Sequence, residues 1–267
     1  MTVERRETFD EIAELYDRAR PRYPAELFID LEVLAGLGPS SRVLEVGTGT
    51  GIATLPLAER GYRVVAVELG GALAAVAEAK LAPFADVELV RSAFEDWPLP
   101  AEPFDLVVSA TAWHWIDPAV GYAKAAQALR PGGSLAIVRY HHVAGEDAGF
   151  FVAAQGCYEQ FTPDYDPAFR LPAPDAVVPD TAALEASGLF EPPAVRTYLV
   201  EKRYSDHEYV DLLATFSANR LLAEPMRAAF LDCIGAVIRE RFDGRIRRHF
   251  LHELTLAHKA AGENRPP

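Results

Sequence analysis

The chain of 267 residues contains only two cysteines, Cys157 and Cys233, far apart in sequence and without a CxxC spacing. Such a pair cannot build a disulfide framework or a cysteine-rich zinc site, so we expect two buried free thiols in a reducing compartment and no metal site. No apolar stretch approaches the roughly 20 residues that a membrane helix needs, and the N-terminal residues lack the apolar run of a signal peptide. We therefore expect a soluble, cytoplasmic protein without a membrane partner.

Basic residues are also scarce, with 26 Lys and Arg against 39 Asp and Glu, which gives a net charge of −13. Phosphate backbones repel this charge, and we expect no nucleic-acid partner. The chain is 50% apolar and 24% charged, values typical of a globular protein rather than of a disordered chain or a coiled coil. Oligomeric state stays open between a monomer and a homodimer.

Short runs rich in Val, Leu and Ile alternate with helical patterns through the first two-thirds of the chain, which predicts an α/β fold with a parallel sheet between two layers of helices. Near-continuous apolar strands suit burial on both faces. Five such strands are expected, and two more follow after a proline-rich crossover. For the last of the seven, a helix is the alternative. These strands are Arg42–Val46, Arg63–Glu68, Val87–Arg91, Phe104–Ser109 and Ser134–Tyr140, then Val195–Tyr204 and Arg247–His258.

Helix signals lie between these strands. Helices are predicted at Glu7–Ala19, Ile52–Arg60, Gly71–Lys80, from Asp117-Pro118, Asp180–Ser187, from Ser205 to about Leu222, and Pro225–Phe242. Gly61 suits a helix C-terminus, Asp117-Pro118 a helix start, and Ser205-Asp206-His207-Glu208 a capping box. The fold expected is a doubly wound, Rossmann-like, mostly parallel seven-stranded sheet with an N-terminal cap helix and helical insertions.

The most informative segment is Val43–Gly51, VLEVGTGTG, an apolar strand that breaks into glycines at alternate positions before a helix. Glycines permit a sharp turn and let a ligand approach bare backbone, and the helix offers unpaired N–H groups. Glu68 stands at the end of the next strand, where a carboxylate can accept hydrogen bonds from both hydroxyls of a ribose. The arrangement predicts a nucleoside site at the carboxyl edge of the sheet.

The spacing discriminates between nucleosides. A dinucleotide fold prefers GxGxxG, whose helix start receives a pyrophosphate, whereas this chain has GxGxG with Glu45 two residues before Gly47. A carboxylate there repels a pyrophosphate but suits a cationic amino group. A ligand that joins a ribose to an aminoacyl cation therefore fits better than NAD.

These segments resemble the class I S-adenosylmethionine-dependent methyltransferases, in the small-molecule branch close to the methyltransferase-11 type. VLEVGTGTG is similar to their first motif and AVEL, Ala66–Leu69, to their second. RSAFEDWPL is similar to the segment bordering the adenine, FDLVVSATAWHWID to the fourth motif, and LRPGGSLAIV to the approach to the fifth strand. YDRARPRYP, Tyr16–Pro24, resembles the N-terminal cap of small-molecule members.

The resemblance implies S-adenosyl-L-methionine as cofactor and assigns its contacts residue by residue. Glu45 would lie near the ammonium group, Glu68 would bind the ribose hydroxyls, and Leu69 would pack on the adenine. Ser92 replaces the Asp of many relatives, which weakens its assignment to the adenine edge. The remaining implied cofactor contacts are Tyr16, Arg20, Gly47, Thr48, Gly49, Gly51, Ala93, Phe94, Ser109, Ala110 and Thr111.

Histidines after the fourth and fifth strands, His114, His141 and His142, are candidates for a catalytic base, because a neutral imidazole can accept a proton from a nucleophile. His114 is equally consistent with a hydrogen-bonded spacer, and only one of the adjacent pair is expected to face the site. Substrate contacts are expected from Tyr23, Trp113, Trp115 and Tyr158, for which core packing is the alternative.

Two C-terminal groups are assigned to the surface. The segment His249–Glu253 does not match HExxH and is interpreted as strand surface. Five arginines are interpreted as a solvated helix end and turn, with an anion-binding patch as the alternative; they are Arg239, Arg241, Arg245, Arg247 and Arg248.

We therefore expect one domain over residues 1–267, with a cap at 1–35, a cofactor-binding core at 36–140, and substrate-lid elements with the last strands at 141–267. The expected activity is methyl transfer to a small-molecule acceptor by in-line displacement at the sulfonium methyl. A nicotinamide-dependent oxidoreductase and a non-catalytic nucleoside-binding protein are the alternatives.

Overall fold

A computed structural model describes residues 9–145, 148–162 and 165–261. The chain divides into two compact units. The sheet unit comprises Arg22–Tyr140, Val178–Tyr198 and His252–Pro267, and the helical unit comprises Met1–Pro21, His141–Val177 and Leu199–Leu251. None of the described helices is both long and apolar enough to cross a membrane. The expected assignment of cap, core and lid to three regions stays a prediction.

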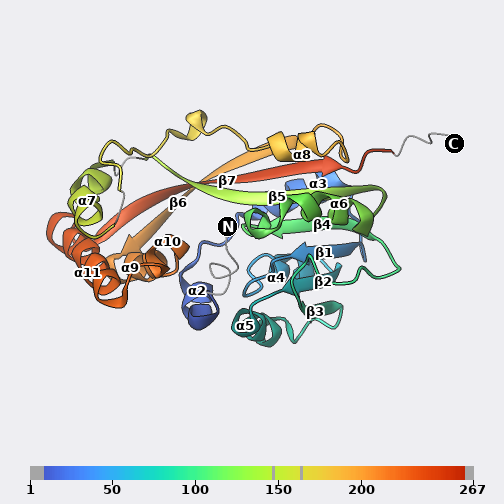
Figure 1. The fold of residues 1–267 in the computed structure, drawn as a ribbon, viewed down its shortest axis with the longest axis horizontal. Coiled ribbons are helices and arrows are strands. Elements are labelled where there is room, and N and C mark those ends of the chain that lie inside the picture. Colours follow the sequence, from blue (N-terminus) through green and yellow to red (C-terminus); the bar gives the residue numbers. More distant parts are fainter. Residues whose placement is uncertain (1–8, 146–147, 163–164, 262–267) are drawn as a thin grey trace. The chain divides into compact units, whose positions relative to one another are not determined.

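Seven strands form one sheet in the order β3-β2-β1-β4-β5-β7-β6 (Figure 1). The pairings β2–β3, β1–β2, β1–β4 and β4–β5 are all parallel. The order reverses direction beside β1, which is the topological switch point where open α/β sheets bind ligands. The strands are β1 (Arg42–Val46), β2 (Arg63–Glu68), β3 (Val87–Arg91), β4 (Phe104–Ala110), β5 (Leu129–Val143), β6 (Ala194–Ser205) and β7 (Arg245–His258).

Strand side chains of the sheet unit alternate between two cores. Leu44 and Val46 of β1 pack in the core beneath α6 (Pro118–Ala128), whereas Val43 packs with Leu27 and Leu31 of α3 (Ala25–Ala35). Successive residues of a strand point to opposite faces, so a run that is apolar at every position must be covered on both sides. This confirms the doubly wound α/β prediction. The sheet unit also contains α4 (Thr54–Glu59), α5 (Gly71–Leu81), η2 (Trp113–Trp115) and α8 (Ala182–Ala186), whereas η3 (Pro174–Ala176) belongs to the helical unit.

Helices dominate the other unit. It contains η1 (Asp10–Ile12), α2 (Ala13–Ala19), α7 (Ala148–Phe161), α9 (Asp206–Ala214), α10 (Ser217–Arg220) and α11 (Glu224–Arg241). α11 packs on both α7 and α9, and α2 packs on α9. Its interior is aromatic: the Phe150 ring meets Tyr209 and Phe242 edge-on, at centroid distances of 5.3 and 5.7 Å.

The predicted strands β1, β2 and β3 coincide with the observed ones, while β5 begins and ends outside the expected Ser134–Tyr140. β5 begins at Leu129 because Leu129 pairs with Phe104 of the parallel strand β4. No local sequence pattern specifies this register. The N-terminal helix is shorter than expected, and residues 7–8 of that prediction lie outside the described residues. α3 was missing from the predicted elements.

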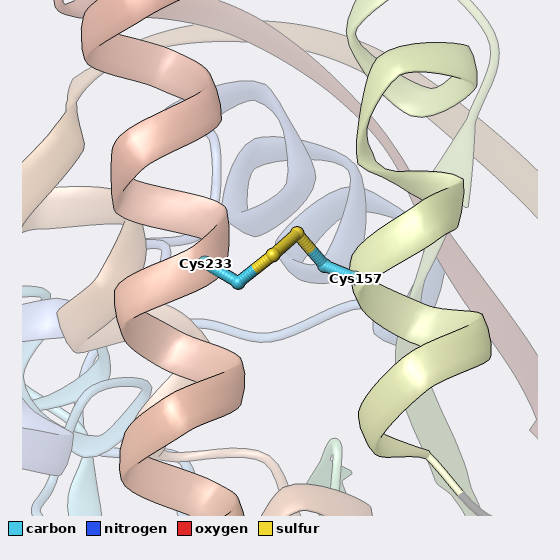
Figure 2. The surroundings of a disulfide bond; sticks show 2 residues. All are labelled: Cys157 and Cys233. Atoms are coloured by element: carbon cyan, nitrogen blue, oxygen red, sulfur yellow. A yellow bond between two sulfur atoms is a disulfide. The ribbon is translucent and has the colours of Figure 1, made fainter.

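The expected free thiols are wrong. Cys157 of α7 and Cys233 of α11 form a disulfide, with their Cα atoms 5.9 Å apart (Figure 2). The spacing of cysteines along the chain can reveal a cysteine cluster. One isolated disulfide requires only that two packed helices bring one cysteine of each close together in a suitable orientation. That juxtaposition is a tertiary property, so the sequence interval of 76 residues could not indicate it.

The last strand is confirmed as a strand, but the assignment of its segment His249–Glu253 to the surface is wrong. His252 and Glu253 are completely buried, and Phe250 and Leu251 are buried as well. β7 lies between β5 and β6 and is therefore an interior strand. The polar residues of β7 are typical of a solvent-exposed edge strand. In the structure, β5 and β6 flank β7 on both sides and exclude water from it.

The capping box at the start of α9 offers a test of local stability. The Ser205 hydroxyl accepts the Glu208 N–H at 3.2 Å, and the Glu208 carboxylate accepts the Ser205 N–H at 2.8 Å. Ser205→Ala should lower the free energy of unfolding by about 1 kcal/mol, measured by urea denaturation. Ser205→Thr keeps the acceptor and should cost clearly less; equal losses would contradict the capping role.

Candidate functional site

The glycine segment after β1 forms a tight turn at the carboxyl edge of the sheet unit. The N–H groups of Gly47 and Thr48 both donate to the Val67 carbonyl of β2, at 2.9 and 3.3 Å. Gly47 has φ 74°, and a Cβ built on it would lie 2.4 Å from the Cβ of Ala112. Both the left-handed backbone and this close approach exclude a larger residue. The turn is therefore held between β2 and the segment after β4.

Glu68 points into this turn, as its predicted role requires. Its Oε2 accepts the Gly49 N–H at 2.7 Å, and its Oε1 accepts the Gly70 N–H at 2.8 Å. Only 7% of the residue is exposed. A carboxylate held in this position stands at the edge where the sequence predicts a ribose.

Glu45 lies on the same edge and is almost completely buried, at 1% exposure. Burial, together with the negative charge of Glu68, raises the pKa of Glu45 to about 8, so the ligand-free carboxyl is mostly neutral at pH 7. Its Oε2 has no hydrogen-bond partner among the described residues, and neither has the buried Oγ1 of Thr48. Such orphaned atoms at a turn indicate a place built for a polar ligand.

An apolar surface stands beside these polar groups. Leu69 follows Glu68 directly and leaves 41% of its surface exposed, which suits a residue predicted to pack on a flat base. Ser92 donates its hydroxyl to the Ala93 carbonyl at 3.0 Å, and its N–H bonds to the Glu68 carbonyl. Phe94 is 2% exposed and packs in the core, so only its backbone is available to the predicted adenine contact.

The residues after β4 complete the edge. The Ser109 hydroxyl donates to the Val46 carbonyl at 2.8 Å and ties β4 to the end of β1. Ala110 ends β4. Thr111 follows with φ 59°, a left-handed conformation that is costly for a β-branched residue and marks functional sites. The Thr111 hydroxyl is 2.6 Å from the hydroxyl of Tyr23, which precedes α3.

A residue that sequence reasoning missed lies behind Tyr23. The His252 ring is completely buried, and neither of its nitrogens has a hydrogen-bond partner among the residues that the structure describes. Its centroid is 5.8 Å from that of Tyr23 and 5.9 Å from that of Tyr140. Burial lowers the pKa of His252 to about 4, so this imidazole is neutral at physiological pH. No local signal distinguished it from the other polar residues of β7.

The aromatic segment after β4 divides between core and surface. Trp113 is 6% exposed and packs between Phe94 and Tyr122, with centroid distances of 6.4 and 5.3 Å, which favours the packing interpretation. His114 is exposed, and its ring lies 4.8 Å from that of Trp115.

The remaining candidates belong to the helical unit. Arg20 donates to the Thr215 carbonyl at 2.7 Å, with its guanidinium 4.7 Å from the Tyr16 ring centre. Burial, with the charges of Arg248, Arg20 and His141, lowers the pKa of His142 to about 3. Tyr158 stacks on Tyr165 at 5.3 Å between ring centroids. The roles predicted for these candidates stay predictions.

The donor set fits the implied cofactor. The Glu45 carboxyl, the Glu68 carboxylate and the exposed Leu69 match an ammonium group, a ribose and a base, respectively. Within residues 9–145, 148–162 and 165–261, no group of three or more His, Cys, Asp or Glu side chains could hold a metal ion.

Comparison with known proteins matches the part of the chain that carries this site. Residues 44–137 match the model of a methyltransferase domain, and they run from within β1 to within β5 and include the glycine turn. This part of the chain therefore resembles a methyltransferase domain. The suspected resemblance is thereby confirmed.

Two curated relatives each match about half of the chain. An uncharacterized methyltransferase of Mycobacterium tuberculosis is 41% identical over 141 residues, which cover 52% of this chain and 55% of that protein. A tRNA 5-carboxymethoxyuridine methyltransferase of Escherichia coli is 32% identical over 148 residues, with 50% and 56% covered. This chain thus spans about half the length of the curated relatives it matches.

Solved structures share the fold across most of the chain. A putative type II methyltransferase of Anaeromyxobacter dehalogenans has a TM-score of 0.57 at 24% identity and covers 90% of this chain and 97% of its own. A SAM-dependent methyltransferase of Thiobacillus denitrificans, in complex with S-adenosyl-L-homocysteine, has a TM-score of 0.53 at 15% identity, with 94% and 97% covered.

The buried Glu45 generates a prediction about pH. Its pKa is raised in the folded state, so folding becomes less favourable as the pH rises from about 4.5 to about 8, because only the unfolded chain ionises freely. Glu45→Gln removes this penalty. We expect the variant to be more stable than the wild type at pH 7.5 by about 2–4 kcal/mol, and equally stable at pH 4.5. Chemical denaturation across this range measures the difference; a constant difference would contradict the buried, neutral carboxyl.

Proposed function

We propose that this protein transfers the methyl group of S-adenosyl-L-methionine to a small-molecule acceptor. One observation carries the proposal: the Glu68 carboxylate reaches into the glycine turn and hydrogen-bonds Gly49, while Glu45 lies buried beside it with an unpaired oxygen. The matched methyltransferase domain supports this reading. So does the Thiobacillus denitrificans structure, which shares the fold and was solved with the product form of that cofactor.

The proposed binding mode assigns each group a task. Glu68 would bind the ribose hydroxyls, and Leu69 would cover one face of the adenine. Glu45, neutral when the site holds no cation, would ionise beside the ammonium group, since an adjacent positive charge favours the carboxylate. Binding would thereby be coupled to the release of a proton from Glu45.

Bound at this edge, the cofactor supplies an activated methyl group on a positively charged sulfur. The protein must then align the acceptor, exclude water and, where needed, remove a proton from the nucleophile. Alignment alone can contribute roughly 7–11 kcal/mol in favourable cases. A conspicuous catalytic residue is therefore not required.

Tyr23 is the residue best placed to align an acceptor at this edge. Its hydroxyl hydrogen-bonds Thr111, whose strained backbone follows β4 beside the glycine turn. The neutral His252 packs edge-on against the Tyr23 ring and would fix its orientation. We assign Tyr23 to acceptor contact and His252 to positioning Tyr23.

A small acceptor is favoured over a nucleic acid by charge. A net charge of −13 repels phosphate backbones. The Escherichia coli relative is named as a tRNA methyltransferase but matches only half of this chain, so tRNA is the competing acceptor to test. A nicotinamide-dependent oxidoreductase is disfavoured by the GxGxG turn and by Glu45, and a non-catalytic binding protein is distinguished only by assay.

Cofactor binding is the first test. Glu68→Gln should weaken the binding of S-adenosyl-L-homocysteine by 10- to 100-fold, because charge-assisted hydrogen bonds to two hydroxyls become neutral ones. Isothermal titration calorimetry measures the affinities. Glu88→Gln, an exposed acid on neighbouring β3, should bind like the wild type, and NADH should not bind. Unchanged affinity in Glu68→Gln, or tight binding of NADH, would refute the site.

Transfer is the second test. With labelled S-adenosyl-L-methionine, label should enter the metabolite fraction of an extract and not purified total tRNA. Tyr23→Phe should lower the rate of transfer about tenfold while leaving S-adenosyl-L-homocysteine affinity within twofold, since the hydroxyl bonds Thr111 and not the turn. Label in tRNA would replace the small-molecule acceptor. Cofactor binding without transfer to either fraction would favour the binding-protein alternative.

A further inference from the structure

The helical unit contains a cavity of about 120 Å³ that the proposed methyl transfer does not use. It lies between residues of α7, the segment after it, and β7. Its lining residues are Ala144, Gly145, Phe151, Val152, Gln155, Tyr165, Phe169, Arg170, Leu171, Arg247, Arg248 and His249. Apolar side chains form most of the wall, the arginines are its charged members, and none of the described lining residues is acidic.

Arg248 is the unusual member of this wall. It was expected to be part of a solvated turn, and that expectation is wrong, because only 3% of the residue is exposed. Its guanidinium lies over the Phe151 ring at 4.0 Å from the ring centre and 5.9 Å from that of Tyr209. Among the described residues, no carboxylate oxygen lies within 4.0 Å of the Arg248 guanidinium nitrogens. A buried charge without a counter-ion is costly.

The other basic residues of the wall already have partners. Arg247 and His249 both approach the carboxylate of Glu201, at 3.7 and 3.5 Å. Arg170 donates to the carbonyls of Pro167 and Phe169, at 2.8 and 2.7 Å. The uncompensated charge is therefore that of Arg248.

The unpaired atoms of Arg248 define the chemistry of the missing partner. Nε and Nη2 are buried and have no hydrogen-bond partner among the described residues. These two N–H groups lie on one edge of the guanidinium, and this edge binds a carboxylate by two parallel hydrogen bonds. The stack on Phe151 fixes the plane of the fork, so little rotamer entropy would be lost on binding.

The size of the cavity limits the rest of the ligand. A cavity of ~150 Å³ lined by apolar side chains holds benzene, and this one is slightly smaller. Walls from Phe151, Val152, Tyr165, Phe169 and Leu171 suit a body of one aromatic ring. We propose that this cavity is a binding site for a small aromatic carboxylate, held by a bidentate contact to Arg248.

Benzoate is the probe for this site. In the full chain without cofactor, we expect saturable benzoate binding by calorimetry and ligand-observed NMR, with a rise in melting temperature. Benzamide has the same ring without the charge and should bind at least tenfold more weakly. Equal affinity for the two compounds would refute the proposal. So would the absence of benzoate binding at about 50 mM, a concentration 50 times a dissociation constant of 1 mM.

Arg248→Met tests the assigned residue. It keeps an apolar side chain of similar length and removes the buried charge, so the ligand-free variant should melt no lower than the wild type. It should lose benzoate affinity at least tenfold, together with the benzoate-induced rise in melting temperature. Arg241→Gln, an exposed arginine of the same unit at the end of α11, is the matched control and should bind benzoate normally. Normal benzoate binding by Arg248→Met would overturn the assignment.

A second variant keeps the test valid if Arg248→Met does not fold. Val152 lines the cavity but leaves 62% of its surface exposed, so a larger side chain there costs little stability. Val152→Trp should obstruct the cavity and abolish benzoate binding with Arg248 intact. S-adenosyl-L-homocysteine affinity should be unchanged in both variants, so failure of this site and failure of the proposed methyl transfer are distinguishable.

Discussion

The contact between the Glu68 carboxylate and the Gly49 N–H is the interaction on which the site depends. It joins the end of β2 to the turn after β1, and a second bond to Gly70 anchors the same carboxylate at the start of α5. Parallel pairing of β1 with β2 brings the two strand ends together, and the left-handed glycines let the backbone pass close enough. One charged group therefore orders both the turn after β1 and the start of α5.

The same edge of the sheet contains buried polar atoms that have no hydrogen-bond partner among the described residues. Glu45 is held neutral by burial, and the Thr48 hydroxyl beside it lacks a partner within the described chain. Thr111 sustains a left-handed backbone that its β-branched side chain disfavours. Native structures retain such costs where a ligand or a reaction repays them. The concentration of these features around one turn distinguishes this edge from an ordinary strand–helix junction.

Much of the fold, and the meeting of Glu68 with the glycine turn, was predictable from sequence because the signals are local. β1, β2 and β3 are apolar runs bounded by turn residues, and the spacing from Gly47 to Glu68 reflects one strand–helix–strand unit. The failures depend on packing between distant segments. Cys157 meets Cys233 only because α7 packs on α11, and His252 and Arg248 are buried only because β7 is an interior strand. Residue type alone suggested thiols and a solvated surface at these positions.

The bond between Cys157 and Cys233 has a practical consequence for handling the protein. It closes the intervening polypeptide into a covalent ring that includes α8, β6, α9 and α10. A protease that cuts once inside this ring releases no fragment, because both products stay tethered through sulfur. On a gel without reductant, such a nicked chain would migrate as one species, so intactness can be judged only after a thiol has been added.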